Sequence, residues 1–386
     1  MTTPALHSRR APPLANRAQN SRAMTALREE TADLALTRSP DLKVPQRDAD
    51  WIARTLAGVG PVTAPANRPR QIVFTAFSRF GFGAKGKVYA EDYFPAFTRR
   101  MAEHGVDCHF VWDEAGLESH MTGKPTAIVH MMNEEKIWPY NARIREAEAK
   151  ADFVFCSKRA ANLLKEKPVT NRYLTPRGIP MPRMLAPEET GLRAFSNSVE
   201  GSGKRIIVTD SPETLDPARY NTAFIDTRVP FEGKTYYTMF RIQSVTRKVL
   251  HAYVRARDTA EKAASVHSKD TPADAGLIEM LYDLLIRPRQ DEITAFTDRL
   301  GRIIGPGCYA CDMVVCNSTG KMFMVEAGFK FNDSPYAKYL ESVADRTPSN
   351  AIFYGGEYPV RAADLFIEEW VWSSRYFTAD PTGMTI

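Results

Sequence analysis

The chain has 386 residues, of which 44% are hydrophobic and 25% charged, so it is long enough for two or three domains with substantial cores. No apolar run is long enough to cross a bilayer, the net charge of +5 is mild, and we expect neither a membrane nor a nucleic-acid partner. Five cysteines and an N-terminal segment without an apolar signal region favour reduced thiols and a cytoplasmic location.

Residues 1–69 are interpreted as a disordered tail followed by a linker. The tail is rich in Ala, Ser, Pro and Arg and can bury little apolar surface. A transit-like segment and an arm that touches nucleic acid are the alternatives for its arginines.

Residues 70–157 predict a Rossmann-like domain, because apolar strands alternate there with amphipathic helices, as in βαβ units with a parallel sheet. We expect strands at 71–77, 106–112, 126–130 and 153–155, and helices at 93–104 and 141–151. Open α/β sheets bind ligands beyond the carboxyl ends of their strands. Three polar or aromatic residues that follow the third strand are therefore candidates for substrate contacts: Asn133, Glu134 and Trp138.

From residue 158 the pattern changes to short apolar strands bounded by turn residues, which predicts an antiparallel meander. These strands are expected at 205–208, 223–225, 236–242 and 248–254. Helices are expected at 159–165, 291–304 and 362–376, and the last can dock on its own domain or on a second copy.

An acidic hairpin is the most informative local feature. Two apolar, half-buried strands are predicted at Cys311–Cys316 and Lys321–Glu326. Between them, Gly320 suits the left-handed position of a three-residue loop. Counting back from a closing pair of Asn317 with Lys321 places Asp312 directly opposite Glu326. Like charges in opposed sheet positions repel, so we expect a cation between them, and Mg²⁺ prefers such oxygen ligands. The alternative is an ordinary surface hairpin whose acids point at water.

The segment Lys167–Arg183, in which a lysine is followed by Gly-Ile-Pro-Met-Pro, resembles the entry to the ATP-grasp domain. The acidic hairpin downstream is similar to the metal-binding hairpin of that superfamily, and a Rossmann-like domain is what the superfamily places before the first motif. The resemblance implies two α+β lobes with ATP between them, which we expect at 158–245 and 246–386.

The resemblance also implies a role for individual residues. Lys167 would contact the ATP phosphates, and Asp312 and Glu326 would hold Mg²⁺ against them. The hinge between the lobes would offer its backbone to the adenine and comprises Phe224, Ile225 and Asp226. Arg241 lies where the superfamily often has an arginine, while Arg255 and Arg257 alternate along one strand and suit a phosphate or carboxylate clamp. A solvent-exposed basic sheet face is the alternative for these two arginines.

The sequence departs from the superfamily pattern at two points. Many members have a second lysine on the strand before a glycine-rich loop, where this chain has Ser196 or Asn197, and Lys204 is a possible substitute from the other side of the loop. The usual Glu-x-Asn ending of the hairpin is replaced by Glu326-Ala-Gly, so Asn332 is the candidate for a replacement metal ligand.

The resulting hypothesis is an ATP- and Mg²⁺-dependent ligase that activates a small-molecule or peptide carboxylate as an acylphosphate for attack by an amine or thiol. A degenerate nucleotide-binding or scaffold protein without turnover is the first alternative, and a kinase acting on a hydroxyl acceptor is the second. A glycosyltransferase with two Rossmann-like domains fits only the first 160 residues. The oligomeric state stays open, with a dimer plausible.

Overall fold

The computed structural model describes residues 71–75, 94–111, 113–131, 141–186, 188–199, 206–261, 264, 266, 272, 274–329 and 358–376. The predicted tail and linker lie outside these residues, as do the substrate candidates Asn133, Glu134 and Trp138. None of the helices in the described ranges is long and apolar enough to span a membrane.

The first layer is a four-stranded sheet of order β2-β1-β3-β4 in which all neighbours are parallel, as the alternating pattern predicted. Its helices begin at short polar caps: Asp113 accepts a hydrogen bond from the backbone of the first turn of α6, and Asn141 does the same for α7. The elements are β1 (Gln71–Thr75), α5 (Phe94–Glu103), β2 (Asp107–Val111), α6 (Glu114–Ser119), β3 (Thr126–His130), α7 (Ala142–Lys150) and β4 (Phe153–Phe155).

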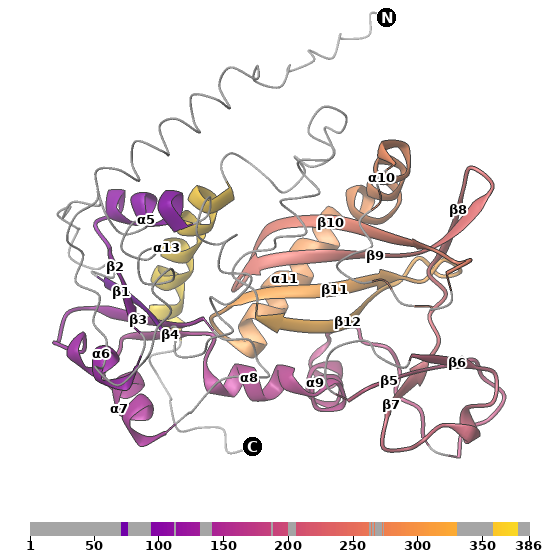
Figure 1. Ribbon diagram of the computed structural model, residues 1–386, viewed down its shortest axis with the longest axis horizontal. Coiled ribbons are helices and arrows are strands. Elements are labelled where there is room, and N and C mark those ends of the chain that lie inside the picture. Colours follow the sequence, from indigo (N-terminus) through magenta and orange to yellow (C-terminus); the bar gives the residue numbers. More distant parts are fainter. Residues whose placement is uncertain are drawn as a thin grey trace, which may run out of the picture.

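Both faces of this parallel sheet are covered. Val73 and Ile128 pack against α6 and α7 on one face. On the other, Phe74 contacts α5 and the final helix α13 (Tyr358–Tyr376), whose Phe366 lies 5.5 Å from the ring of Phe97. Figure 1 shows α13, in yellow, running beside α5 although more than 250 residues separate them in the sequence. The C-terminal helix therefore completes the core of the first domain.

A helical pair and a small antiparallel sheet follow. The sheet has the order β6-β5-β7. The strand predicted at 223–225 lies earlier in the structure, because β7 ends at Ala223. Residues 224–227 form a linker between β7 and β8. The elements are α8 (Lys158–Lys165), α9 (Lys167–Leu174), a 3₁₀ turn (Thr175–Arg177), β5 (Ala194–Asn197), β6 (Ile207–Thr209) and β7 (Tyr220–Ala223).

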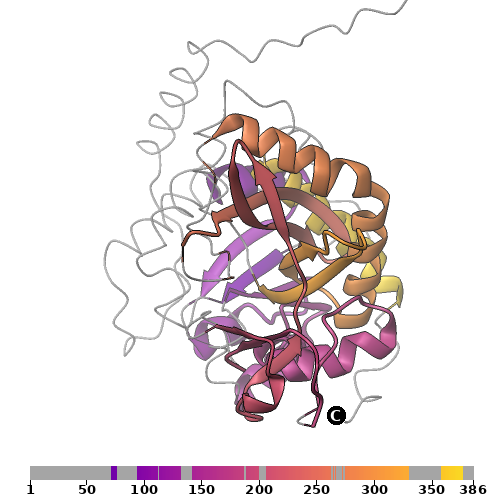
Figure 2. The ribbon, with the colours of Figure 1, turned by 90° about the vertical axis from the view of Figure 1, so that its right-hand side faces the viewer.

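The largest layer is a five-stranded antiparallel sheet of order β10-β9-β11-β12, with β8 also paired to β9. Apolar residues on one face pack against α10, the π-helix and α11, which Figure 2 shows along the outer side of the sheet. The elements are β8 (Arg228–Phe231), β9 (Lys234–Val245), β10 (Lys248–Asp258), α10 (Ala275–Leu281), the π-helix (Tyr282–Ile286), α11 (Gln290–Ile304), β11 (Cys308–Val315) and β12 (Met322–Phe329).

The large sheet begins at Arg228, so strands on both sides of the predicted lobe boundary at 245/246 belong to it. Its inner face looks towards the small sheet across the linker at 224–227, and the architecture as a whole is mixed α/β, as expected from the sequence.

Candidate active site

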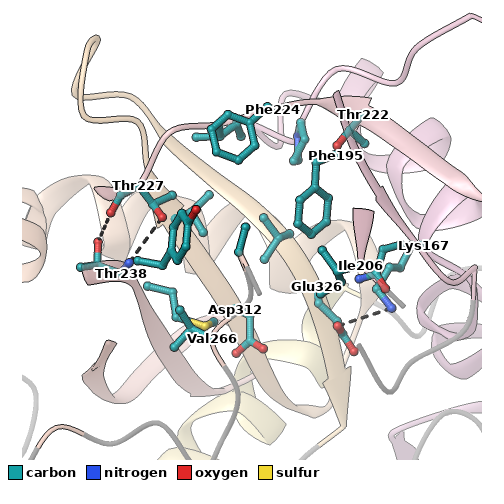
Figure 3. Close-up of a pocket in the computed structure, with 18 of the residues that line it drawn as sticks. Lys167, Phe195, Ile206, Thr222, Phe224, Thr227, Thr238, Val266, Asp312 and Glu326 are labelled. Carbon is teal, nitrogen blue, oxygen red and sulfur yellow. Dashed lines mark hydrogen bonds and ion pairs between the residues drawn. The ribbon is translucent and has the colours of Figure 1, made fainter. Parts of the chain in front are cut away.

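A cavity of about 270 Å³ lies between the small sheet and the inner face of the large sheet. Figure 3 shows that Phe195 and Phe224 stand at one end of it, whereas Asp312, Glu326 and Lys167 stand at the other. The cavity therefore has an apolar end and a charged end. Its lining comes mainly from α9, the small sheet, the linker and strands β9 to β12, with Pro182, Ala264 and Val266 added from connecting segments.

Asp312 of β11 lies directly opposite Glu326 of β12, as the sequence predicted. The route to this register differs from the expected one. Cys316 pairs with Lys321, so the loop has four residues rather than three, and Val315 faces Met322. A β-bulge then adds one residue to β12 between the tip and Glu326, which compensates for the shift. Gly320 has a φ of 68°, the left-handed conformation expected of it.

The bulge determines which way Glu326 points. Met322 and Met324 face the apolar core, so strict alternation would bury Glu326 there as well. A carboxylate without a partner in such a core is costly. Because Val325 and Glu326 both line the cavity, the extra residue turns Glu326 to the polar side and returns Ala327 to the core.

Cationic side chains surround the two carboxylates. Arg241 of β9 is the cross-strand neighbour of Asp312 and donates to both of its oxygens, Nε to Oδ1 at 2.6 Å and Nη2 to Oδ2 at 2.9 Å. Lys167 at the start of α9 approaches Glu326 with Nζ 3.5 Å from Oε2. The structure brings Arg241, Asp312, Lys167 and Glu326 together in the lining of one cavity, and their roles in ligand binding stay predictions.

Arg255 of β10 lies beneath this group with only 1% of its surface exposed. Its guanidinium donates to the hydroxyl of Tyr253, and Nη1 lies 3.7 Å from Oδ1 of Asp312. Two arginines therefore position Asp312, one by a bidentate contact and one by charge. Three cations and two carboxylates line the charged end, which suits a polyanionic ligand.

The carboxylates also suit a divalent cation. A carboxylate offers about four lone-pair positions, and the Arg241 fork uses two of those on Asp312. Two carboxylates plus oxygens from a phosphate group form the all-oxygen ligand set that Mg²⁺ prefers. Among the described residues, no group of three or more His, Cys, Asp or Glu residues gathers at one place, so a metal here would need ligands from outside that set.

Burial raises the pKa of Glu326 above its usual value of 4.5, and the nearby Asp312 adds to this effect, whereas Lys167 and Arg241 oppose it. The folded protein therefore binds a proton at Glu326 at a pH where the unfolded chain has released it. As pH rises from the pKa of the unfolded chain through the higher pKa of the folded protein, the contribution of Glu326 to the free energy of unfolding falls. Between pH 5 and pH 8 we therefore expect Glu326→Gln to gain melting temperature relative to wild type, by on the order of 1 °C because solvent screens this half-exposed group, in addition to the pH-independent cost of leaving Lys167 without its carboxylate. The gain should shrink towards pH 5 in thermal scans, and a pH-independent difference would contradict it.

The apolar end of the cavity contains two aromatic residues, Phe195 and Tyr237, that the sequence analysis did not select. Phe195 of β5 and Tyr237 of β9 line it together with Phe224 and Ile225 of the linker. The linker is fixed by Thr238, whose hydroxyl donates to the carbonyl of Thr227 at 2.7 Å. A flat heterocycle fits between such groups, with linker backbone beside it. A period of two counted back from Arg241 would have identified Tyr237.

The remaining predicted residues have different environments. Asp226 is not among the cavity-lining residues, and its carboxylate is engaged by Arg228 at 2.7 Å. Arg257 also lies off the lining and pairs with Glu261 at 2.9 Å. For both, a role in ligand binding stays a prediction. Lys204 and Asn332 lie outside the described residues.

The structure distinguishes the two candidates for the missing lysine position. Asn197 lines the cavity, whereas Ser196 points the other way and accepts a hydrogen bond from Nε of Arg219 at 2.8 Å. Adjacent residues on a strand face opposite sides. Of the two candidates, Asn197 is therefore the one that faces the cavity, where it places an uncharged amide.

No protein-family model matches the sequence, and no curated protein matches it. Solved structures do match. The RimK domain ATP-grasp protein from Sphaerobacter thermophilus is 13% identical with a TM-score of 0.38, over 74% of this chain and 100% of that chain. The ATP-grasp ligase PsnB, solved with a minimal precursor, is 14% identical with a TM-score of 0.40, over 78% and 99%. D-alanine–D-alanine ligase from Bacillus anthracis, solved with ATP, is 11% identical with a TM-score of 0.44, over 80% and 99%. The solved structures similar to this chain thus include ATP-grasp ligases, the superfamily whose motifs the sequence resembles.

Proposed function

We propose that this protein is an ATP- and Mg²⁺-dependent ligase that converts a carboxylate into an acylphosphate and passes the acyl group to an amine or thiol. The observation that carries the proposal is the charged end of the cavity. There Asp312 and Glu326 oppose each other across a hairpin and three cations approach them from the other strands and from α9. An aromatic end suited to a purine lies in the same cavity.

In the proposed reaction a substrate carboxylate oxygen attacks the γ-phosphorus of ATP, and ADP leaves with the electron pair of the broken P–O bond. The amine or thiol then attacks the acyl carbon, and phosphate leaves. Neither step needs a nucleophile from the protein. Bound Mg²⁺ would supply charge neutralisation at the phosphates.

The side chains of this protein contribute positioning and charge. Arg241 and Arg255 hold Asp312 in one orientation, and Lys167 brings a positive charge from the other lobe to the place where negative charge gathers. Such preorganised charge accelerates a reaction because it needs no rearrangement at the moment of transfer. Holding both reactants in one cavity adds the advantage of proximity.

Asn197 supports a second candidate, a nucleotide-binding protein without turnover. The amide gives the small sheet no positive charge at the position where a lysine was expected. A protein of this kind would bind nucleotide in the cavity but would not transfer the γ-phosphoryl group.

Calorimetric titration with a non-hydrolysable ATP analogue, with and without Mg²⁺, tests the proposal. We expect Mg²⁺-dependent binding that weakens at least about tenfold in Lys167→Ala, because a charge-assisted contact contributes about 1.5–3 kcal/mol. Lys165→Ala, on the preceding helix, is the matched control and should bind as wild type does. A Lys167→Ala protein with unchanged affinity would remove that residue from the nucleotide site. A folded wild-type protein that binds no analogue at all would overturn the proposed function.

A further inference from the structure

The two carboxylates of the cavity are paired with cations in different ways. Asp312 is gripped by the guanidinium fork of Arg241 through two short contacts on the same sheet. Glu326 is paired with Nζ of Lys167, an atom of α9 outside the sheet, at 3.5 Å. The first pair is held in place by two parallel hydrogen bonds, whereas the second depends on one flexible side chain.

Lys167 has the geometry of a replaceable counter-ion. Its backbone N–H donates to the carbonyl of Val199 at 3.1 Å, which anchors the start of α9 to the small sheet. The side chain extends from this anchor along the cavity wall with 7% of its surface exposed, and it ends beside a carboxylate that is 44% exposed. A lysine stem is flexible, so a stronger anion in the cavity could draw the ammonium from Glu326 while the backbone anchor of the helix stays in place.

The position of this ammonium matters for a divalent cation. A metal ion bound to Glu326 would lie within a few ångströms of Nζ, and two positive charges at that separation repel strongly in a partly buried site. The guanidinium of Arg241 also places positive charge near such a metal, but its fork is directed at Asp312, where it uses two lone pairs and leaves the others available. Metal affinity therefore depends on where Lys167 points.

A polyphosphate would change that position. Its several negative charges attract the ammonium more strongly than the single carboxylate does, and the phosphate oxygens complete the ligand set of the metal. Lys167 would then contact the phosphates of the nucleotide, and Glu326 would bind the cation.

We infer that Lys167 competes with the divalent cation for Glu326, so that the metal enters this site only together with a polyphosphate. This inference rests on the proposed function, and it adds an order of binding: nucleotide and metal bind as a unit, and the metal alone is excluded. Without Lys167, the Asp312–Glu326 pair would be a cation site in its own right.

Binding of Mn²⁺ alone, measured from the electron paramagnetic resonance signal of the free ion, tests the inference. We expect wild-type protein to bind Mn²⁺ weakly without nucleotide and at least about tenfold more tightly with a non-hydrolysable ATP analogue. Lys167→Met, which keeps the length of the side chain but removes its charge, should bind Mn²⁺ alone at least about tenfold more tightly than wild type does. Lys165→Met is the matched control and should behave as wild type.

The tighter binding of Mn²⁺ should disappear in the double variant Lys167→Met/Glu326→Gln. If Lys167→Met folds poorly, Lys167→Gln should show the same tighter binding of Mn²⁺. Equal Mn²⁺ affinity of wild type and both Lys167 variants would overturn the inference, as would tight binding of Mn²⁺ alone to wild type. Failure of the proposed function has a different signature. In that case wild type would show no gain in Mn²⁺ affinity with the ATP analogue, whatever the Lys167 variants do.

Discussion

Asp312→Asn and Glu326→Gln should each lower the turnover of the ligase reaction by at least about 10²-fold, the usual effect of losing one preorganised charged contact. Both substitutions keep the shape of the side chain and remove its charge. In Asp312→Asn the Arg241 fork also loses one of its two acceptors, because the amide nitrogen cannot accept. Asp312→Asn is therefore expected to be the more damaging of the two.

The measurement is ADP formation during a screen of carboxylates with amines and thiols, followed by comparison of variants on the best pair. Glu292→Gln is a suitable control, because this glutamate lies half-exposed on α11 and outside the cavity lining. It should retain wild-type turnover. Activity near the wild-type level in both Asp312→Asn and Glu326→Gln would rule out the hairpin as the metal site.

Glu369→Ala should destabilise the protein by about 3–5 kcal/mol, the cost of breaking a buried ion pair from one side. Glu369 of α13 has no exposed surface and accepts hydrogen bonds from Nε and Nη2 of Arg247, both at 3.1 Å. Arg247 lies in the turn between β9 and β10, so the pair joins the C-terminal helix to the large sheet. Removing the glutamate takes both of these acceptors from the Arg247 guanidinium, which is 10% exposed, while Asp298 stays 3.2 Å away. Urea unfolding monitored by circular dichroism measures the loss.

The adjacent residue provides the control. Glu368 is 48% exposed and forms a surface pair with Arg361 at 3.3 Å, so Glu368→Ala should change stability by less than about 1 kcal/mol. Replacing both partners, as in Arg247→Met/Glu369→Leu, should recover much of the lost stability because no unpaired charge stays buried. Similar losses for Glu368→Ala and Glu369→Ala would contradict this account of the helix docking.

The sequence predicted which residues of the acidic hairpin face each other, but not the turn and bulge that produce this register. The opposition of Asp312 and Glu326 was predicted and is confirmed, yet it is produced by a four-residue loop and a bulge that offset each other. A residue count along two strands cannot detect a bulge, because a bulge adds one residue to only one of them. The signal for it is the pair Val325-Glu326, in which two adjacent residues both line the cavity.

Contacts between distant parts of the chain could not be predicted from the sequence alone. The sequence indicated Lys167 and Glu326 separately, but their approach to 3.5 Å depends on how α9 packs beside β12. The choice between Ser196 and Asn197 likewise required the register of β5 against β6 and β7. The parallel strands and their helices were easier, because burial on both faces leaves a long apolar pattern in the sequence.

The docking of α13 has a consequence for the order in which the protein can be built. The parallel sheet is encoded by residues 71–155, but Phe366 and other residues of α13 belong to its core. A ribosome that adds roughly 5–20 residues per second needs about 10–40 s to travel from the end of β4 to this helix. During that interval α5 alone covers its face of the nascent sheet and the part that belongs to α13 stays uncovered, while the large sheet emerges. The parallel sheet is thus completed only after the large sheet has been made, and chaperone protection should matter most during that interval.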